Sequence, residues 1–166
     1  MMKLRAFERE DSPIIASWIR TETELYQWSA DRFGFYPLQP YSIDEHYTLA
    51  KESGRFFPLT GVDEEGKVVG SLILRYPLEN DDSRLRIGFV IVDPELRGMG
   101  YGRELIRLAV EYAKNNLKAA TVDLGVFDNN SKARKCYEAV GFEEYGSHVI
   151  ETPFGTWNCT DLKIDF

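Results

Sequence analysis

Long apolar runs, paired cysteines and an excess of positive charge are all missing from this chain of 166 residues. No stretch of 18 apolar residues occurs, so no membrane-spanning helix is expected, and the start MMKLRAFERED lacks the apolar core of a signal peptide. The two cysteines, Cys136 and Cys159, form no CxxC pair, which predicts neither a disulfide framework nor a metal site. These absences favour a cytoplasmic protein.

The charge of the chain excludes some partners and is unevenly distributed. A net charge of −7 argues against a nucleic acid or a membrane surface as partner. Residues 97–135 nevertheless carry eight Lys or Arg against four Asp or Glu, a local charge of +4, which leaves −11 for the rest. This pattern predicts an anion bound on one side of the molecule and a cation on the other, with chance clustering as the alternative.

The composition, 43% hydrophobic and 13% aromatic residues, is typical of a folded globular protein, and the length suits a single domain over residues 1–166. Residues 85–127 read as strand, helix and parallel strand, whereas most of the sheet is expected to be antiparallel. The segment 25–41 reads as an aromatic, turn-rich loop. Strands are expected at 3–7, 56–63, 68–76, 85–93, 120–127, 142–150 and 156–164, and helices at 11–19, 42–51, 100–115 and 130–139.

The stretch RGMGYGRELI places three glycines at every second position directly before a predicted helix. Glycines let backbone N–H groups approach an anion closely, and a helix N-terminus adds unpaired donors and a positive dipole end. Arg97 and Arg103, on the two flanks, can add charge-assisted hydrogen bonds. The stretch therefore predicts a phosphate or pyrophosphate site, and a glycine-rich turn that only tightens packing is the equal alternative.

Other phosphate-binding loops do not fit this stretch. The P-loop pattern GxxxxGK[ST] is absent, and the spacing is GxGxG rather than the GxGxxG of dinucleotide-binding folds. The motif also follows several predicted strands instead of the first, which disfavours a Rossmann unit.

Two blocks of the sequence do resemble a known family. VDPELRGMGYG resembles the acetyl-CoA signature of the GNAT superfamily of N-acetyltransferases, and NNSKARKCYEAVGF resembles a second signature at a family-like distance. With the order of elements, the resemblance covers roughly residues 1–150. The matching positions are Arg97, Gly100 and Gly102 in the first block and Asn130, Ala133, Tyr137, Gly141 and Phe142 in the second.

The resemblance implies an α/β (α+β) fold with a mixed, mostly antiparallel seven-stranded sheet flanked by about four helices. It implies acetyl-CoA as cosubstrate and Tyr137 as the general acid that protonates the departing thiolate. The alternative for Tyr137 is a half-buried aromatic that packs under the C-terminal hairpin. The cofactor-binding residues that the resemblance implies are Val90, Ile91, Val92, Arg97, Gly98, Met99, Gly100, Tyr101, Gly102, Arg103, Asn130 and Ala133.

The sequence departs from the family at the general base. Members often carry a carboxylate on one of the two central strands, and here those positions hold Arg86 and Gly125. Asp123 is near but displaced by ~7 Å along the strand, so no base is assigned. Other titratable candidates, each of which also reads as an ordinary surface or structural residue, are Glu22, Glu24, Asp31, His46 and His148.

The family mechanism implies direct attack of an amine on the thioester. Cys136 offers a covalent alternative, but no histidine adjoins it in the sequence, and a small buried side chain is the favoured interpretation. The N-terminal third holds many aromatic and acidic residues, which suit a cationic amine. The acceptor is expected to be a small-molecule amine or a protein N-terminus, since the layout resembles the ribosomal-protein N-terminal acetyltransferase branch.

Two other functions remain open at this stage. The absence of carboxylates at Arg86 and Gly125 keeps a non-catalytic acyl-CoA-binding sensor or interaction domain as the main alternative. A nucleotide-binding module that uses the same glycine loop is a weaker one. A homodimer, paired through an exposed edge strand near the C-terminus, is also left open.

Overall fold

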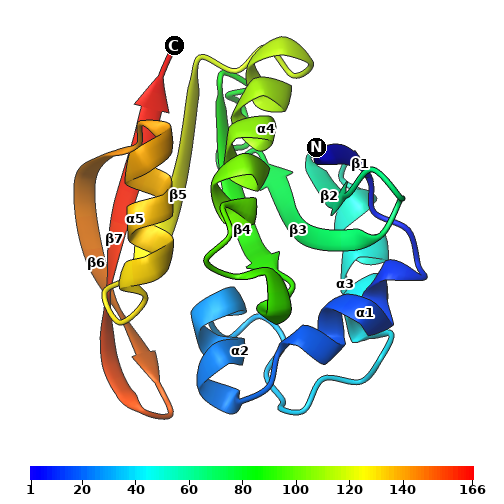
Figure 1. The fold of residues 1–166 in the computed structure, drawn as a ribbon. Coiled ribbons are helices and arrows are strands. Elements are labelled where there is room, and N and C mark those ends of the chain that lie inside the picture. The colour runs from blue at the N-terminus through cyan, green and yellow to red at the C-terminus, as the bar shows by residue number, and fades with distance from the viewer.

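The computed structural model describes residues 1–166, which form one seven-stranded sheet with helices on both faces (Figure 1). The strands are β1 (Lys3–Ala6), β2 (Phe56–Val62), β3 (Val68–Arg75), β4 (Arg84–Val92), β5 (Thr121–Phe127), β6 (Glu143–Thr152) and β7 (Gly155–Asp165). The helices are α1 (Asp11–Trp18), α2 (Glu22–Ser29), α3 (Ser42–Lys51), α4 (Tyr101–Asn115) and α5 (Ser131–Val140), with a short 3-10 helix at Pro94–Leu96.

The sheet has the order β1-β2-β3-β4-β5-β7-β6, and β4 and β5 are its only parallel pair. The chain connects these two strands through α4, as the order strand, helix and parallel strand expected for residues 85–127 predicts. The mixed, mostly antiparallel seven-stranded sheet is therefore confirmed. The longest helix, α4, has 15 residues, and no helix combines the length and the hydropathy needed to cross a bilayer.

Alternating side chains of the strands build two cores, one on each face of the sheet. In β3, Val69 and Leu74 belong to the core beneath α4 and α5, whereas Val68 and Ile73 belong to the core beneath α1, α2 and α3. This strand is buried on both faces, which explains its mostly apolar sequence, and the hydroxyl of its buried Ser71 donates a hydrogen bond to the Leu59 carbonyl. Each fully buried Leu or Ile contributes about 1.5–3 kcal/mol of transfer free energy, so the two cores fix the position of the central strands.

The central strands separate along their length. β4 and β5 pair only from Arg84 to Arg86 against Thr121 to Asp123, although β4 continues to Val92. The register between β3 and β4 also shifts at a bulge, where Phe89 has a φ of 50°. A positive φ is strained for a bulky residue, and bulges of this kind concentrate at functional sites. The opening between β4 and β5 is the part of the fold that can admit a ligand.

One helix was not predicted. Helix α2 occupies Glu22–Ser29, at the start of the segment expected to be an aromatic loop, so the sheet is flanked by five helices instead of about four. The Thr21 side chain caps this helix by accepting a hydrogen bond from the Glu24 amide at 3.0 Å. Thr21 and Glu24 have the spacing of a capping box, so the signal for α2 is present in the sequence.

Helix α1 begins with a buried carboxylate rather than a capping one. Asp11 is 2% exposed and accepts hydrogen bonds from both Nη atoms of Arg5, at 2.8 and 2.9 Å. It also accepts from the Glu8 amide at 2.9 Å and the Thr60 hydroxyl at 2.8 Å. The carboxylate therefore ties α1 to β1 and β2, at the edge of the core beneath the N-terminal helices.

Candidate active site

The glycine stretch forms a tight turn that leads into α4. Gly98 and Gly100 have φ angles of 80° and 88°, and Gly100 is the N-cap of the helix. An L-residue with a side chain pays roughly 1–2 kcal/mol in this left-handed region, so the turn requires glycine at both positions. The exposed Arg97 and Arg103 flank the turn, and Met99, between the glycines, is 67% exposed. The first N–H groups of α4 therefore face an open, positively charged surface.

The third glycine has a different role, because it lets three elements approach one another. A Cβ atom at Gly102 would lie 3.3 Å from Sγ of Cys136 on α5 and 3.9 Å from Cγ2 of Val92 on β4. The end of β4, the start of α4 and the middle of α5 therefore meet here. Tyr137 follows Cys136 on α5, so the two sequence signatures are adjacent in space.

The remaining predicted cofactor residues surround this junction. The bulge at Phe89 shifts the alternation of side chains along β4 by one residue. Val90 therefore packs against the core beneath α4 and α5, and Ile91 belongs to the core on the opposite face. Asn130 is the N-cap of α5, and Ala133 packs against the core from the first turn of that helix. Tyr101 opens α4 and packs on the same core.

Tyr137 is almost enclosed at this junction. The residue is 7% exposed, and its ring packs edge-on against Phe142 with 6.3 Å between centroids. Burial, with a smaller effect of Cys136, raises the pKa of the Tyr137 hydroxyl above its ordinary value. The phenol therefore stays protonated at physiological pH, as a proton donor must, and its ring belongs to the core beneath α4 and α5 instead of being half-buried.

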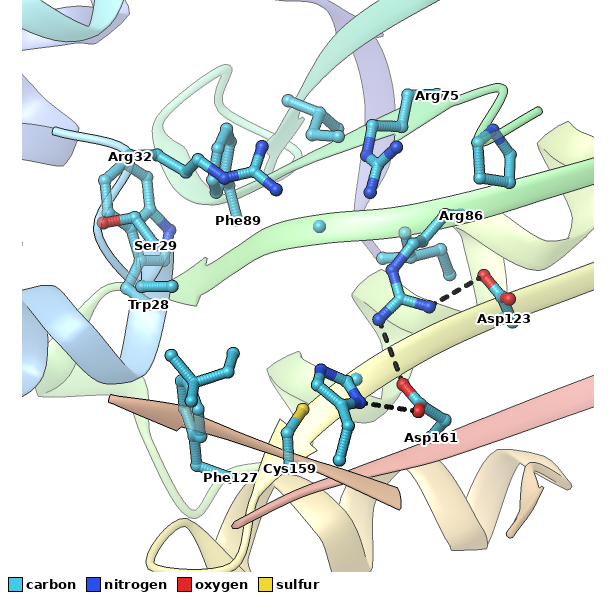
Figure 2. A pocket seen from close by; sticks show the side chains of 18 of the residues that line it. Trp28, Ser29, Arg32, Arg75, Arg86, Phe89, Asp123, Phe127, Cys159 and Asp161 are labelled. Carbon is cyan, nitrogen blue, oxygen red and sulfur yellow. Dashed lines mark hydrogen bonds and ion pairs between the residues drawn. The ribbon is translucent and has the colours of Figure 1, made fainter. Parts of the chain in front are cut away.

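The opposite face of the sheet carries a large cavity. It has a volume of about 600 Å³ and is lined by residues of β3, β4, β5, β6 and β7, together with residues of β2, α3, the end of α2 and the segment after α2 (Figure 2). Phe89 at the bulge of β4 and Phe127 at the end of β5 both line it, so the cavity reaches the opening between these strands. Its charged and titratable lining residues are Arg32, His46, Arg75, Arg84, Arg86, Asp123, Tyr145, His148, Cys159 and Asp161.

Asp123 is not free to act as a base. It is 1% exposed and accepts hydrogen bonds from Nε of Arg84 at 2.8 Å and from the Tyr145 hydroxyl at 2.8 Å. Nη1 of Arg86 lies 3.4 Å from its second oxygen. A carboxylate held by two guanidinium groups serves as their counter-ion, so the structure gives no support to Asp123 as the general base.

Arg86 and Gly125, the usual carboxylate positions of the family, lie against each other. A Cβ atom at Gly125 would lie 2.7 Å from Nη2 of Arg86 and 2.9 Å from Sγ of Cys159. The missing side chain thus leaves the space that the Arg86 guanidinium occupies. From there Arg86 donates a hydrogen bond of 3.2 Å to Asp161 of β7 (Figure 2).

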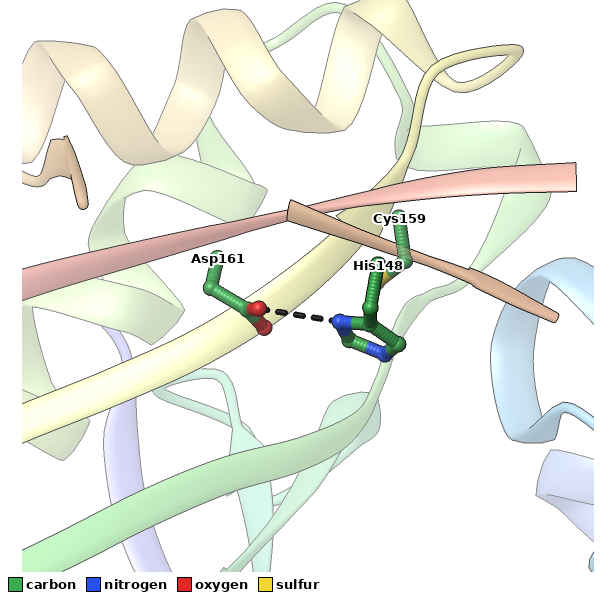
Figure 3. Close-up of side chains that lie close together, drawn as sticks. All are labelled: His148, Cys159 and Asp161. Atoms are coloured by element: carbon green, nitrogen blue, oxygen red, sulfur yellow. Dashed lines mark hydrogen bonds and ion pairs between the residues drawn. The ribbon is translucent and has the colours of Figure 1, made fainter. Parts of the chain in front are cut away.

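Asp161 and His148 form a pair that the sequence reasoning did not connect. Nδ1 of His148 lies 2.9 Å from Oδ2 of Asp161, and both side chains line the cavity (Figure 3). When Nδ1 carries the proton and donates it to Asp161, Nε2 keeps a free lone pair. Such a His–carboxylate pair is chemically suited to accept a proton from a substrate.

Neither cysteine has the lowered thiol pKa that favours nucleophilic attack or metal binding. Burial, then the Asp161 carboxylate, raises the pKa of Cys159 to about 11, and burial also raises the pKa of Cys136. Cys159 lies with His148 and Asp161 such that their ligand atoms are within 4.8 Å of one another (Figure 3). The protonated thiol and the Arg86 cation on Asp161 disfavour a metal ion there.

Most N-terminal candidates lie outside the cavity. Of the four titratable residues considered there, only His46 lines it, and Glu22, Glu24 and Asp31 do not. Burial, with a contribution from Arg32, lowers the pKa of His46, so this imidazole is neutral at physiological pH. The acidic lining expected for a cationic acceptor is therefore not found in this cavity.

Comparison with known proteins agrees with the fold and the two signatures. Residues 22–142 match the acetyltransferase (GNAT) family. Spermine/spermidine N(1)-acetyltransferase of Bacillus subtilis is 27% identical over 101 residues, which are 58% of this chain and 66% of that protein. Spermidine N(1)-acetyltransferase of Vibrio cholerae is 36% identical over 74 residues, 45% of this chain and 42% of that protein. The match thus spans about two thirds of the first relative and less than half of the second.

Solved structures share the whole architecture. Spermidine N-acetyltransferase from Vibrio cholerae, in complex with CoA and spermine, superposes with a TM-score of 0.80 at 23% identity, over 99% of this chain and 95% of that one. Ribosomal-protein-S5-alanine acetyltransferase from Vibrio fischeri gives 0.79 at 17% identity, over 99% and 92%. Because the sequence identities are below 25%, these superpositions show a shared fold and do not by themselves assign a function.

The fold and the family match together define the class of this protein. Because the match covers most of the chain, the protein belongs to the acetyltransferase (GNAT) family, whose members are N-acetyltransferases that use acetyl-CoA. The resemblance stated from the two sequence signatures is confirmed at this level.

Proposed function

We propose that this protein binds acetyl-CoA at the turn before α4 and transfers the acetyl group to a primary amine by direct attack. The observation that carries the proposal is the junction at Gly102, which brings β4, the start of α4 and Tyr137 of α5 together beside the opening between β4 and β5. Two curated relatives are named for polyamine acetylation and a structural neighbour for acetylation of a ribosomal protein, which supports an amine acceptor.

The pyrophosphate of the cosubstrate binds at residues 98–103 in this proposal. The N–H groups at the start of α4 donate to its oxygens, and Arg97 and Arg103 neutralise its charge. Val90, Ile91 and Val92 lie along the opened edge of β4 and contact the pantetheine arm and the thioester, whereas Asn130 and Ala133 border the far side from α5. The apolar strand and the charged turn match the two ends of acetyl-CoA.

The acceptor amine enters from the cavity on the other face. His148, oriented by Asp161, accepts through Nε2 the proton that the amine nitrogen loses as it bonds to the thioester carbonyl carbon. As the carbon–sulfur bond breaks, the Tyr137 hydroxyl donates its proton to the departing sulfur. Asp161 thereby replaces, through His148, the carboxylate that the family often carries on a central strand.

A non-catalytic acyl-CoA-binding domain is the alternative function. It was motivated by the missing carboxylates at Arg86 and Gly125, and the pair of His148 and Asp161 in the cavity weakens that motive. Cofactor binding alone does not separate the two functions, so turnover must be measured.

Calorimetric titration with acetyl-CoA, followed by measurement of thiol release with a pool of amines and short peptides, tests the proposal. Saturable binding with amine-dependent thiol release is the expected result. Binding without release from any amine or peptide would favour the sensor, and absence of binding would remove the assignment of residues 98–103 to the pyrophosphate.

A further inference from the structure

The charges that face the cavity are unbalanced. Four guanidinium groups line it, and the only carboxylates that do so are Asp123 and Asp161. Both carboxylates are already held, since Asp123 accepts from Arg84 and lies near Arg86, and Asp161 accepts from Arg86 and contacts His148. An excess of two positive charges therefore remains among the residues that line the proposed acceptor cavity.

Arg75 is the group on which this excess is concentrated. It is half-buried at the end of β3, directly opposite Arg86 in the β3–β4 ladder, and both side chains line the cavity. Like charges directly opposite each other in a sheet are destabilising. Arg75 nevertheless has no salt bridge and no side-chain hydrogen bond within the protein, although each of its neighbours Arg84 and Arg86 has a carboxylate.

Arg32 adds a second unpaired cation from a different element. It follows α2, forms no salt bridge, and lines the same cavity. Figure 2 shows the side chains of Arg32, Arg75 and Arg86 pointing toward one shared space from three parts of the chain. Burial, followed by the charges of Arg86 and Arg32, lowers the pKa of Arg75, which is the response expected of a cation that lacks a counter-ion.

Such an arrangement fits an anionic group on the acceptor. A guanidinium binds a carboxylate through two parallel hydrogen bonds, and a second guanidinium beside it adds to the selectivity for an anion. A polyamine brings several positive charges and no group that could pair with Arg75, so its binding would increase the repulsion. The cavity is therefore mismatched to the polyamines for which the curated relatives are named.

We propose that the acceptor is an amine that also bears a carboxylate, as an amino acid does, and that Arg75 and Arg32 bind this carboxylate while the amine faces His148. The inference rests on the proposed function, since it concerns the acceptor side of the same site. Arg86, which lies between Arg75 and Asp161, links the carboxylate subsite to the base.

The test compares acceptors that differ only in the carboxylate. Alanine is paired with ethylamine and 4-aminobutyrate with propylamine, within a panel that includes the common amino acids and spermidine, and thiol release from acetyl-CoA is measured. The best amino acid is expected to exceed its decarboxylated partner by roughly 10- to 100-fold in kcat/KM, the ratio that charge-assisted hydrogen bonds supply.

Two variants locate the effect. Arg75→Gln should remove most of this preference and leave acetyl-CoA affinity unchanged, whereas Arg75→Lys should retain part of it. Arg107→Gln is the matched control, because Arg107 lies on the outer surface of α4 and pairs only with Glu104 and Glu111. The control should keep the full preference.

The failures of the two proposals are distinguishable. Acetyl-CoA binding with equal or better turnover of spermidine, simple amines or peptides would overturn the carboxylate subsite and leave the acetyltransferase function intact. Absence of acetyl-CoA binding would overturn the proposed function and this inference with it. If acetyl-CoA binds but no thiol is released, titration of the CoA complex with N-acetylalanine and N-acetylglutamate decides, and binding that does not depend on Arg75 overturns the inference.

Discussion

Asp161 of β7 lies directly opposite Gly125 of β5 in the antiparallel ladder. The carboxylate that the family often places on the central strand is thus present one strand away, and the Arg86 guanidinium fills the space that the glycine leaves. Asp161 in turn contacts His148. The cavity therefore contains a His–carboxylate pair and a cation close to the positions where members of the family often carry a carboxylate.

Replacement of His148 tests its role as the base. His148→Gln should lower kcat/KM by roughly 10²–10⁴-fold, the range for loss of a general base, with little change in acetyl-CoA affinity. Single-turnover measurement of thiol release should show the same decrease, because proton transfer from the amine belongs to the acetyl-transfer step and not to the binding of acetyl-CoA.

The second histidine supplies the comparison for that experiment. His46 contacts no carboxylate and packs against Phe33 at 4.9 Å between ring centroids, so His46→Gln should lower kcat/KM far less than His148→Gln does. Wild-type kcat/KM in His148→Gln would remove His148 from the proposed mechanism.

Replacement of Tyr137 tests the general acid. Tyr137→Phe keeps the ring that packs against Phe142, so acetyl-CoA affinity and folding should be preserved, whereas turnover should decrease by roughly 10²–10⁴-fold. Burial raises the pKa of the hydroxyl, so loss of its proton should not limit the wild-type rate below pH of about 10. Stopped-flow measurement of thiol release checks both expectations.

Tyr47 is the matched control for loss of a buried hydroxyl. Its hydroxyl is buried without a hydrogen-bond partner beneath α3, and it does not line the cavity. Tyr47→Phe should leave turnover unchanged and raise the free energy of unfolding by about 1 kcal/mol, because an unsatisfied polar group is removed. Wild-type turnover in Tyr137→Phe would exclude the phenol as the acid.

The turn before α4 can be tested through its backbone. Gly100→Val should abolish measurable acetyl-CoA binding, because φ of 88° is strained for valine and a relaxed turn would no longer present its N–H groups. Gly66, in the turn between β2 and β3, has φ of 82° and, like Gly100, open space around its Cβ position. Gly66→Val should therefore cost comparable stability without loss of binding, and calorimetry of both variants separates strain from function.

The charge of the Asp11 carboxylate makes the stability of the fold depend on pH. Burial alone would raise its pKa, but hydrogen bonds from Arg5, the Glu8 amide and Thr60 outweigh it and hold the pKa of Asp11 below its usual range. Because the pKa of Asp11 is lower in the folded protein than in the unfolded chain, the charged carboxylate stabilises the fold at pH values above the unfolded pKa of about 4. This stabilisation is lost as the pH falls through the folded-state pKa.

Asp11→Asn should consequently lower the free energy of unfolding by about 2 kcal/mol at pH 7. The difference from the wild type should shrink as the pH decreases below about 4, because the Asp11 carboxylate of the unfolded chain then takes up a proton more readily than that of the folded protein. Urea denaturation of both proteins from pH 7 to pH 3 measures it, and a difference that stays constant with pH would contradict the linkage.

Local patterns in the sequence were enough to predict much of the fold and the tight turn that leads into α4. The glycine spacing and the apolar strand before it mark the turn into α4, and both are set by residues near one another in the chain. Helix α2 was missed because the aromatic residues from Tyr26 onward concealed the capping signal of Thr21 and Glu24. The signal was local and could have been found.

The acceptor side could not be predicted in the same way. His148 is half-exposed and Asp161 is mostly buried, and both lie in a hairpin whose sequence has no recognisable motif. Only the pairing of β5 with β7 places Asp161 opposite Gly125. Likewise, Arg75 and Arg86 read as unrelated strand residues until the β3–β4 register sets them side by side.

The sequence by itself indicated the class of the protein through the resemblance of two blocks to a known family, and it determined the turn and the helix that follow β4, because neighbouring residues with local backbone preferences encode them. The tertiary structure alone decided which charges face the cavity. That arrangement depends on strand order and register, which arise from the burial of apolar faces contributed by the whole chain. The pairing of His148 with Asp161 and the unpaired arginines thus follow from packing across the sheet, and no motif in the sequence contains them.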